Sequence, residues 1–210
     1  MSEKPRVVIA TPLYGHPSPW FLVSFARLLI EVGASGVGAG WCFTTIPYID
    51  QARNQLVREC LTYDPTHVFW VDHDVTVPPT AVSDLLRHDL PIVGGMYHSK
   101  DVPYGPVAFG LDPFEMYQEV PPTENLHLVG GLGMGATLVR ADVYRLMKMQ
   151  YEDEAWYQVH TGKPDIGEDV HFAMRLQEMG YPVFLDPTVA CGHIRDQVVS
   201  AQDYVAARKG

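Results

Sequence analysis

Short apolar runs alternate with stretches of helical periodicity along the first half of the chain. The segments expected as strands and helices, in turn, are 6–11, 19–33, 36–46, 50–61, 68–72, 80–87 and 91–96. A helical connection carries the chain back to the end of the sheet where the previous strand began, so strands separated by helices pair in parallel. The sequence therefore predicts an α/β fold with a mostly parallel central sheet flanked by helices.

The second half of the chain is less regular. Between 97 and 122 the composition shifts toward Pro, Gly, Tyr and Phe, which indicates irregular structure or short antiparallel strands over the site. Further elements are expected within 128–140, 141–149, 167–179 and 182–186. The glycines in 130–135 mark either a kinked strand or a close backbone approach to a sugar or nucleotide, and both interpretations stay open.

Length and composition fit one folded domain. A chain of 210 residues with 47% hydrophobic and 19% charged residues is typical of a globular protein. No apolar stretch reaches the roughly 20 residues of a transmembrane helix, and the amino terminus lacks the features of a signal peptide. Cys42, Cys60 and Cys191 have no close spacing, which predicts reduced thiols. We therefore expect a cytoplasmic protein without membrane insertion.

The apolar run 68–71 ends abruptly in Asp72-His73-Asp74. A strand that is apolar on both faces belongs inside a sheet, and carboxylates at its carboxyl end face the crevice where open α/β sheets bind ligands. Carboxylate oxygens suit Mg²⁺ or Mn²⁺ shared with a substrate's phosphates. The triplet predicts a metal that holds a diphosphate, although acids after a strand also cap helices and shape turns.

A second group of polar residues follows late in the chain. Glu168 and Asp169 open a helix after Gly167. Acids in a first helical turn suit the helix dipole, so simple capping is one interpretation. The other is that one carboxylate faces the crevice and acts as the general base for an acceptor hydroxyl. His193, in Gly192-His193, follows the final strand, where a lone histidine is more often structural than a ligand.

Taken in order, these pieces resemble the metal-dependent GT-A glycosyltransferases, especially small family-2-like and mannan-polymerase-like proteins, over nearly the full length. The matching pieces are Thr11-Pro12, Ala52-Arg53-Asn54, Phe69-Trp70-Val71-Asp72-His73-Asp74, Gly94-Gly95-Met96-Tyr97, Gly131 to Thr137, Gly167-Glu168-Asp169, Leu185-Asp186-Pro187 and Gly192-His193. The resemblance implies a single GT-A domain over 1–210, with a nucleotide-sugar-binding half at about 1–100 and an acceptor-binding half at about 101–210.

The resemblance also implies a metal and donor site. Asp72 and Asp74 correspond to the Asp-x-Asp element, in which the first acid contacts ribose or metal and the last ligates the metal. His193 is expected as a third ligand of Mn²⁺ or Mg²⁺. Thr11 and Tyr14 are expected at the nucleotide base and ribose.

Other roles implied by the resemblance concern the acceptor and the phosphates. Asp169 is the preferred base, with Glu168 at the acceptor or donor sugar, provided that the enzyme inverts the anomeric configuration. Arg53 is expected to pair with an acid near the nucleotide or to reach a phosphate, and a structural salt bridge is equally compatible with the sequence. Lys100 is placed near a phosphate, although a solvated loop lysine is the commoner outcome.

The expected function is transfer of a sugar from a UDP- or GDP-sugar to an acceptor hydroxyl. Compact members of the family occur in bacteria and phages, so a glycan and a modified DNA base both remain as acceptors, with the host cytoplasm as location for a viral protein. A net charge of −10 disfavours DNA, although one basic patch has candidate members in Lys163, Arg175, Arg195, Arg208 and Lys209. The alternatives are a sugar-phosphate nucleotidyltransferase and a non-catalytic nucleotide-sugar-binding module. The sequence leaves the oligomeric state undetermined.

Overall fold

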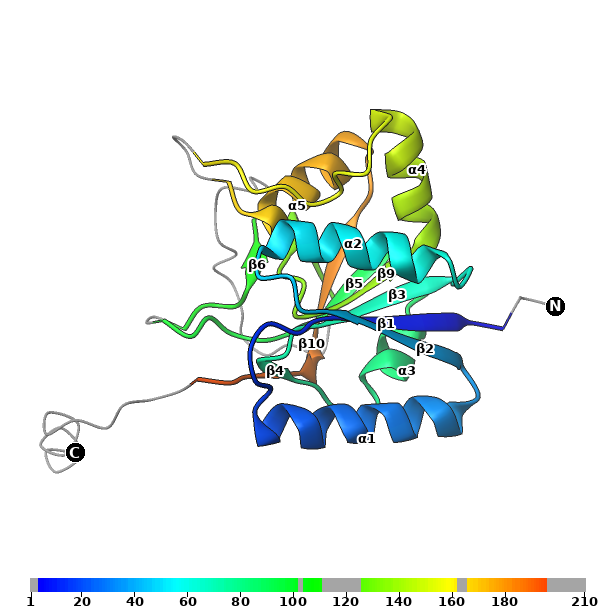
Figure 1. The fold of residues 1–210 in the computed structure, drawn as a ribbon, viewed down its shortest axis with the longest axis vertical. Helices are drawn as coiled ribbons and strands as arrows, with labels where there is room; N and C mark the ends of the chain where they lie inside the picture. The colour runs from blue at the N-terminus through cyan, green and yellow to red at the C-terminus, as the bar shows by residue number, and fades with distance from the viewer. Residues whose placement is uncertain (1–3, 102–103, 111–125, 162–165, 196–210) are drawn as a thin grey trace, which may run out of the picture.

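The computed structural model describes residues 4–101, 104–110, 126–161 and 166–195. They form a seven-stranded sheet with helices on both faces (Figure 1). Its strands, in spatial order, are β2 (Gly38–Thr44), β1 (Arg6–Pro12), β3 (His67–Val71), β9 (Ala136–Arg140), β5 (Ile92–Met96), β10 (Val183–Ala190) and β7 (His127–Val129). The predicted α/β class with a mostly parallel sheet is confirmed.

Two strands run against the direction of the others. β9 lies antiparallel between β3 and β5, and β7 pairs antiparallel with β10 at the edge. Two small antiparallel sheets complete the strands: β4 (Val75–Thr76) pairs with β11 (Gly192–His193), and β6 (Ala108–Phe109) pairs with β8 (Gly131–Leu132). The short antiparallel strands expected within 97–122 are represented by β6, whereas 111–125 lie outside the described residues.

Five helices cover the sheet in the described part of the chain. α1 (Pro19–Ser35) and α3 (Ala81–Leu86) lie on one face, and α2 (Ile49–Leu61), α4 (Ala141–Tyr151) and α5 (Glu168–Glu178) lie on the other (Figure 1). α1 starts as expected, because Ser18 Oγ accepts a hydrogen bond from Phe21 N and Pro19 takes the first helical position. It runs past Gly33, the predicted end, and stops at Gly36, whose φ of 71° is the left-handed cap that glycine favours.

The central strand β3 is buried on both faces. Val68 and Trp70 pack in the core under α2, α4 and α5, whereas Phe69 and Val71 pack in the core under α1 and α3. The two cores are therefore separated by one strand whose side chains alternate between them. Because β3 is fixed from both sides, the position at which it ends is fixed as well. This places the triplet that follows.

The glycines near 130–135 pack against protein backbone and side chains. A Cβ on Gly130 would lie 1.7 Å from the Gly110 carbonyl oxygen. A Cβ on Gly135 would lie 2.9 Å from the Tyr97 hydroxyl, which accepts a hydrogen bond from Gly135 N. These contacts favour the packing interpretation of the glycines.

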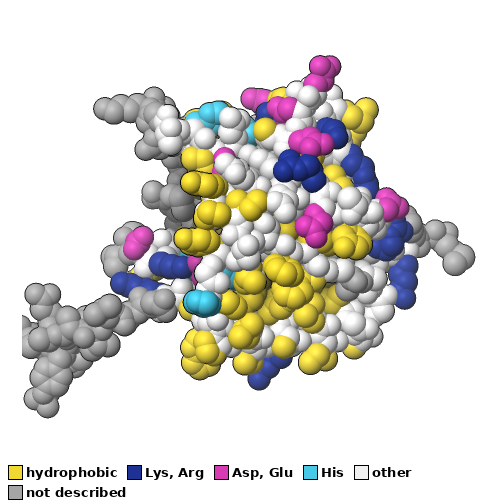
Figure 2. Space-filling model, in the orientation of Figure 1, with side chains coloured by type: hydrophobic (Ala, Val, Ile, Leu, Met, Phe, Trp, Pro, Cys, Tyr) yellow, Lys and Arg dark blue, Asp and Glu magenta, His cyan; other side chains and the backbone are white. Residues whose placement is uncertain are grey.

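Hydrophobic side chains gather on the face where α1 and the edge strand β2 lie (Figure 2). The exposed large apolar side chains of these two elements are Trp20, Leu22, Val23, Ile30, Trp41 and Phe43. None of the described helices is both long and apolar enough to cross a membrane. Cys42, Cys60 and Cys191 are free thiols, as predicted.

Candidate active site

The triplet lies at the carboxyl end of β3, in the turn that leads to β4. Asp72 N donates to the Gly135 carbonyl, and Val75 N donates to the Asp72 carbonyl, at 3.3 and 3.0 Å. His73 Nδ1 lies 3.1 Å from the Pro12 carbonyl, which joins this turn to the end of β1. One hydrogen bond thus closes the turn and two join it to other segments, which fixes the backbone of the triplet.

Arg53 connects the triplet to the late acidic pair. Its Nη1 and Nη2 donate to the two carboxylate oxygens of Asp72, each at 3.1 Å. Its Nε donates to Glu168 Oε1 at 3.3 Å and lies 3.8 Å from Asp169 Oδ1. A planar guanidinium can satisfy acids on two sides at once, which an ammonium cannot do with the same geometry. Asp72, Glu168 and Asp169 therefore belong to one site.

The guanidinium of Arg53 is 2% exposed and lies between aromatic rings. Its Cζ is 5.4 Å from the Trp70 ring centroid and 5.9 Å from that of Tyr157. Of the alternatives for Arg53, the structure shows pairing with an acid, and burial keeps its side chain from the surface. Tyr157 was not predicted from the sequence, because it follows α4 in a segment without periodicity. Asn54 holds it in place, donating to the Tyr157 carbonyl and accepting from its N–H at 2.7 and 3.0 Å.

Three carboxylates share this one guanidinium. Burial would lower the pKa of Arg53, but the carboxylates of Asp72, Asp169 and Glu168 outweigh burial and raise that pKa above its ordinary value. Burial and the neighbouring Glu168 carboxylate raise the pKa of Asp169 well above its ordinary range, against the opposing effect of Arg53. Three carboxylates thus face a single guanidinium, and the folded protein holds a proton on Asp169 to a higher pH than an ordinary aspartate does.

Asp169 also has an unsatisfied oxygen. Its Oδ1 is buried and has no hydrogen-bond partner among the described residues. Gly167, the N-cap of α5, offers no side-chain cap, so Glu168 and Asp169 lie in the first turn with their carboxylates directed at Arg53. Buried polar atoms without a partner are uncommon and often mark functional positions. Both carboxylates thus contact Arg53 in addition to lying at the amino-terminal end of the helix dipole.

Asp74 faces a different set of partners. Its Oδ2 lies 2.5 Å from Lys100 Nζ and 3.6 Å from His193 Nε2. Burial would raise the pKa of Asp74, but hydrogen bonds from His193 and Lys100 outweigh it and hold that pKa well below the ordinary range. Asp74 therefore stays ionised and offers its oxygen to a cation.

The pairing of β11 with β4 brings His193 to the triplet. His193 pairs with Val75, and Ile194 N donates to the Asp74 carbonyl at 2.7 Å. His193 Nδ1 lies 2.8 Å from the His98 carbonyl. Because a carbonyl only accepts, Nδ1 donates in that bond, which leaves Nε2 as the ring nitrogen on the side of Asp74. Nε2 is therefore the nitrogen that a metal ion would take.

The predicted metal ligands are only partly gathered. Asp74 and His193 meet, whereas Asp72 is bound by Arg53, and no three His, Cys, Asp or Glu side chains within the described ranges are arranged to hold a metal ion. Two protein ligands nevertheless fit Mg²⁺ or Mn²⁺, which are commonly completed by phosphate oxygens and water. The cation already beside Asp74, the Lys100 ammonium, shows that the position suits positive charge.

The two residues predicted at the nucleotide differ in exposure. Thr11 is fully buried, and its Oγ1 accepts a hydrogen bond from Trp41 Nε1 at 3.1 Å. Tyr14, in the loop after β1, is 60% exposed. Tyr14 is therefore the member of the pair whose side chain is open to solvent, while Thr11 holds Trp41 of the neighbouring strand.

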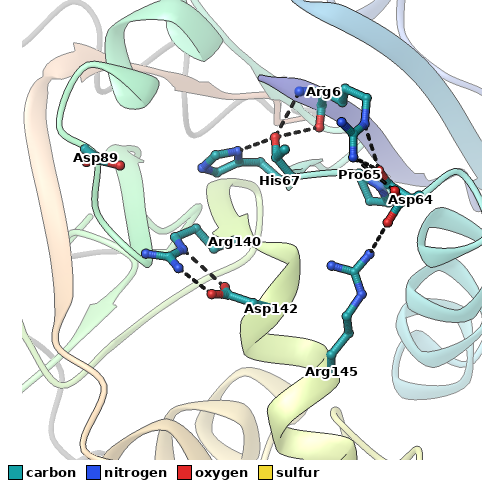
Figure 3. A pocket seen from close by; sticks show the side chains of 9 residues that line it. Arg6, Asp64, Pro65, His67, Asp89, Arg140, Asp142 and Arg145 are labelled. Atoms are coloured by element: carbon teal, nitrogen blue, oxygen red, sulfur yellow. Dashed lines mark hydrogen bonds and ion pairs between the residues drawn. The ribbon is translucent and has the colours of Figure 1, made fainter. Parts of the chain in front are cut away.

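A separate pocket of about 370 Å³ lies at the opposite end of the sheet, where β1 and β3 begin (Figure 3). Its lining residues are Arg6, Asp64, Pro65, Thr66, His67, Asp89, Arg140, Asp142 and Arg145. Figure 3 shows Arg6 and Arg145 directed at Asp64, and Arg140 directed at Asp142. Each arginine of this pocket is thus paired with a carboxylate, which makes it a balanced surface network away from the triplet.

Comparison with known proteins identifies the fold. No family model matches the sequence, and neither does any curated protein. The structure is similar to that of the protein A197 from STIV, with a TM-score of 0.56 and 15% identity over 93% of this chain and 97% of that one. It is also similar to a Drosophila β1,4-galactosyltransferase 7 in complex with manganese, UDP-Gal and xylobiose, with a TM-score of 0.55 and 12% identity over 96% of this chain and 79% of that one.

The chain has the GT-A glycosyltransferase fold. At these identities the likeness concerns the fold alone, and the chemistry has to be argued from the side chains. In the GT-A fold of this chain, β3 delivers the triplet, α2 delivers Arg53, α5 delivers the acidic pair and β11 delivers His193. Four separate elements thus contribute to one site.

Proposed function

We propose that the protein is a glycosyltransferase that moves a sugar from a UDP- or GDP-sugar to an acceptor hydroxyl. One observation carries the proposal: Arg53 binds both Asp72 of the triplet and Glu168 of the acidic pair. A donor held at the triplet and a hydroxyl held at the acidic pair would then be neighbours, which is what group transfer needs. The GT-A fold and the UDP-Gal complex of its structural neighbour support this assignment.

The donor half of the site consists of Asp72, Asp74 and His193, with Tyr14 exposed for the nucleotide. Asp74 and His193 would hold Mn²⁺ or Mg²⁺. Such an ion, when bound, neutralises the diphosphate and makes the nucleotide a better leaving group. Asp72, fixed by both arms of Arg53, would use its remaining lone pairs to accept hydrogen bonds from the donor's ribose.

The acceptor half consists of Glu168 and Asp169. The raised pKa of Asp169 favours it as the base, because a base removes a proton more readily as its own pKa rises toward the working pH. Glu168 is then left to orient the acceptor or donor sugar. The proposal keeps the division into a donor half at about 1–100 and an acceptor half at about 101–210, with His193 assigned to the donor side.

The acceptor is a glycan hydroxyl or a modified DNA base. Of the basic residues considered for a DNA surface, Arg175 is engaged by Asp153 and Arg195 by Tyr104 and the Lys100 carbonyl. The others, Lys163, Arg208 and Lys209, lie outside the described residues. With a net charge of −10, these pairings favour a glycan. A cytoplasmic location suits both the nucleotide-sugar donor and the free thiols.

The decisive experiment separates donor binding from turnover. Wild type with Mn²⁺ and a panel of UDP- and GDP-sugars is expected to release free nucleotide slowly, even without an acceptor. Asp74→Ala is expected to lose metal-dependent donor binding, whereas Asp169→Ala keeps donor binding and loses turnover. No nucleotide-sugar binding by wild type with or without metal would reject the proposal. Pyrophosphate from a nucleoside triphosphate and a sugar phosphate would instead indicate a nucleotidyltransferase, and binding without turnover a non-catalytic module.

A further inference from the structure

Lys100 contacts the same carboxylate oxygen of Asp74 that faces His193. Its Nζ lies 2.5 Å from Asp74 Oδ2, the same oxygen that lies 3.6 Å from His193 Nε2. The carboxylate and the ammonium are each about one third exposed, so the pair lies at the rim of the site, where solvent and ions reach it. A single oxygen of Asp74 thus lies near both the Lys100 ammonium and the His193 imidazole.

The backbone around Lys100 is held from two sides. Ser99 N donates to the Gly105 carbonyl at 2.8 Å, and Arg195 Nη1 donates to the Lys100 carbonyl at 3.2 Å. Arg195 also donates to the Tyr104 hydroxyl. A lysine carries its charge on a flexible four-carbon stem. Lys100 can therefore change its partner by rotating its side chain, without moving the backbone to which it is attached.

An ammonium and a metal ion compete for Asp74 Oδ2. Mg²⁺ and ions of its size bind carboxylate oxygens at about 2.0–2.1 Å, and an ammonium hydrogen bond needs about 2.7–2.9 Å. Two cations on the same oxygen would lie within a few ångströms of one another and repel strongly. His193 differs from Lys100, because its Nδ1 donates to the His98 carbonyl and leaves Nε2, on the side of Asp74, as a nitrogen that could ligate a metal.

We propose that Lys100 is an internal counter-ion that a divalent cation displaces from Asp74, and that the released ammonium then binds the donor's diphosphate. Without an ion, Lys100 neutralises the charge of Asp74 and holds its carboxylate in place. When an ion binds Asp74 and His193, the Lys100 ammonium is repelled from Asp74. It then binds the donor's diphosphate, which would be the nearest remaining anion. Only the second step rests on the proposed function; the first is a property of the protein and the metal alone.

The first step is tested with Mn²⁺ alone, by measuring free Mn²⁺ with electron paramagnetic resonance in the absence of nucleotide. Lys100→Met is expected to bind Mn²⁺ about tenfold more tightly than wild type, since the competing charge is gone. Lys100→Arg, which keeps the charge, is expected to stay near wild type. Lys148→Met is the matched control, because it removes the same charge from α4, where Lys148 pairs with Glu154. Its Mn²⁺ affinity is expected to remain unchanged.

The second step is tested with UDP and GDP at saturating Mn²⁺. Lys100→Met is expected to bind the nucleoside diphosphate about tenfold more weakly than wild type. The same substitution would then raise the affinity for Mn²⁺ and lower the affinity for the nucleotide. Equal Mn²⁺ affinity of Lys100→Met and wild type would overturn the proposal, as would full Mn²⁺ affinity in Asp74→Ala. If wild type uses no nucleotide-sugar, the proposed function fails, while the competition between Lys100 and Mn²⁺ is still decided by the measurement without nucleotide.

Discussion

Arg53 compensates carboxylates from two segments that are far apart in the sequence, and its removal should show how much the fold depends on it. Arg53→Met leaves Asp72 and Glu168 without their cation in a largely buried setting, and the expected loss of unfolding free energy is about 3 kcal/mol. Urea denaturation at neutral pH measures it. Arg58→Met on the same helix is the control. Its half-exposed pair with Glu154 should contribute less than about 1 kcal/mol. Equal losses for the two variants would contradict the role given to Arg53.

Asp169 is the residue where function should oppose stability. Burial and Glu168 raise its pKa when the protein is folded, so above about pH 4 the unfolded chain has released a proton that the folded chain still holds. Its contribution to stability therefore falls as pH rises. Asp169→Asn is expected to raise the unfolding free energy by about 1 kcal/mol at neutral pH, with the gain vanishing near pH 4. Denaturation at both pH values measures this.

Asp153 provides the opposite case for the same experiment. A hydrogen bond from Arg175 lowers its pKa, so its stabilising effect is present above the unfolded pKa and is lost as pH falls. Asp153→Asn should lower stability at neutral pH and have little effect in acid. If Asp153→Asn and Asp169→Asn shift the unfolding free energy in the same direction at neutral pH, the raised pKa of Asp169 does not explain the effect of its substitution.

Two glycines differ in whether the structure has room for a side chain at their positions. A Cβ on Gly130, between β7 and β8, would lie 1.7 Å from a backbone oxygen, so Gly130→Ala is expected to cost about 3 kcal/mol or more in thermal or urea unfolding. A Cβ on Gly33 in α1 meets nothing within 4 Å, so Gly33→Ala should instead stabilise the protein by about 0.5–1 kcal/mol. A tolerated Gly130→Ala would show that this close approach is not needed.

At the scale of elements, local patterns predicted most strands and helices but not how they pair. Ser18 with Pro19 set the start of α1, and the apolar run before Asp72 set the end of β3, because each signal lies within a few residues. The antiparallel position of β9 between β3 and β5 has no local signal, since a buried apolar strand looks alike in either direction. Likewise, the resemblance placed Asp72 and Asp169 in one site, but the contact through Arg53 depends on tertiary packing.

At the scale of the whole molecule, the order of strands predicts where the structure opens. β3 and β9 are paired on both sides, whereas β2 and β7 are edge strands in the described sheet. Amides of β3 and β9 should therefore exchange with deuterium only on global unfolding, and those of β2 and β7 faster, through local opening. Mass spectrometry of peptides from each strand measures the difference. Equal protection of β2 and β3 would contradict the strand order.

Ligand binding should slow exchange in the interior of the sheet, including strands that do not touch the ligand. A donor bound only by the folded state adds stability of about 2.7 kcal/mol at a hundredfold excess over its Kd, so amides that exchange by global unfolding should slow about a hundredfold. With Mn²⁺ and the accepted nucleotide-sugar, this slowing is expected throughout β3 and β9, and Asp74→Ala should abolish it. Slowing confined to β4 and β11, the strands that carry the triplet's turn and His193, would mean that the ligand stabilises only that corner and that the site opens independently of the sheet.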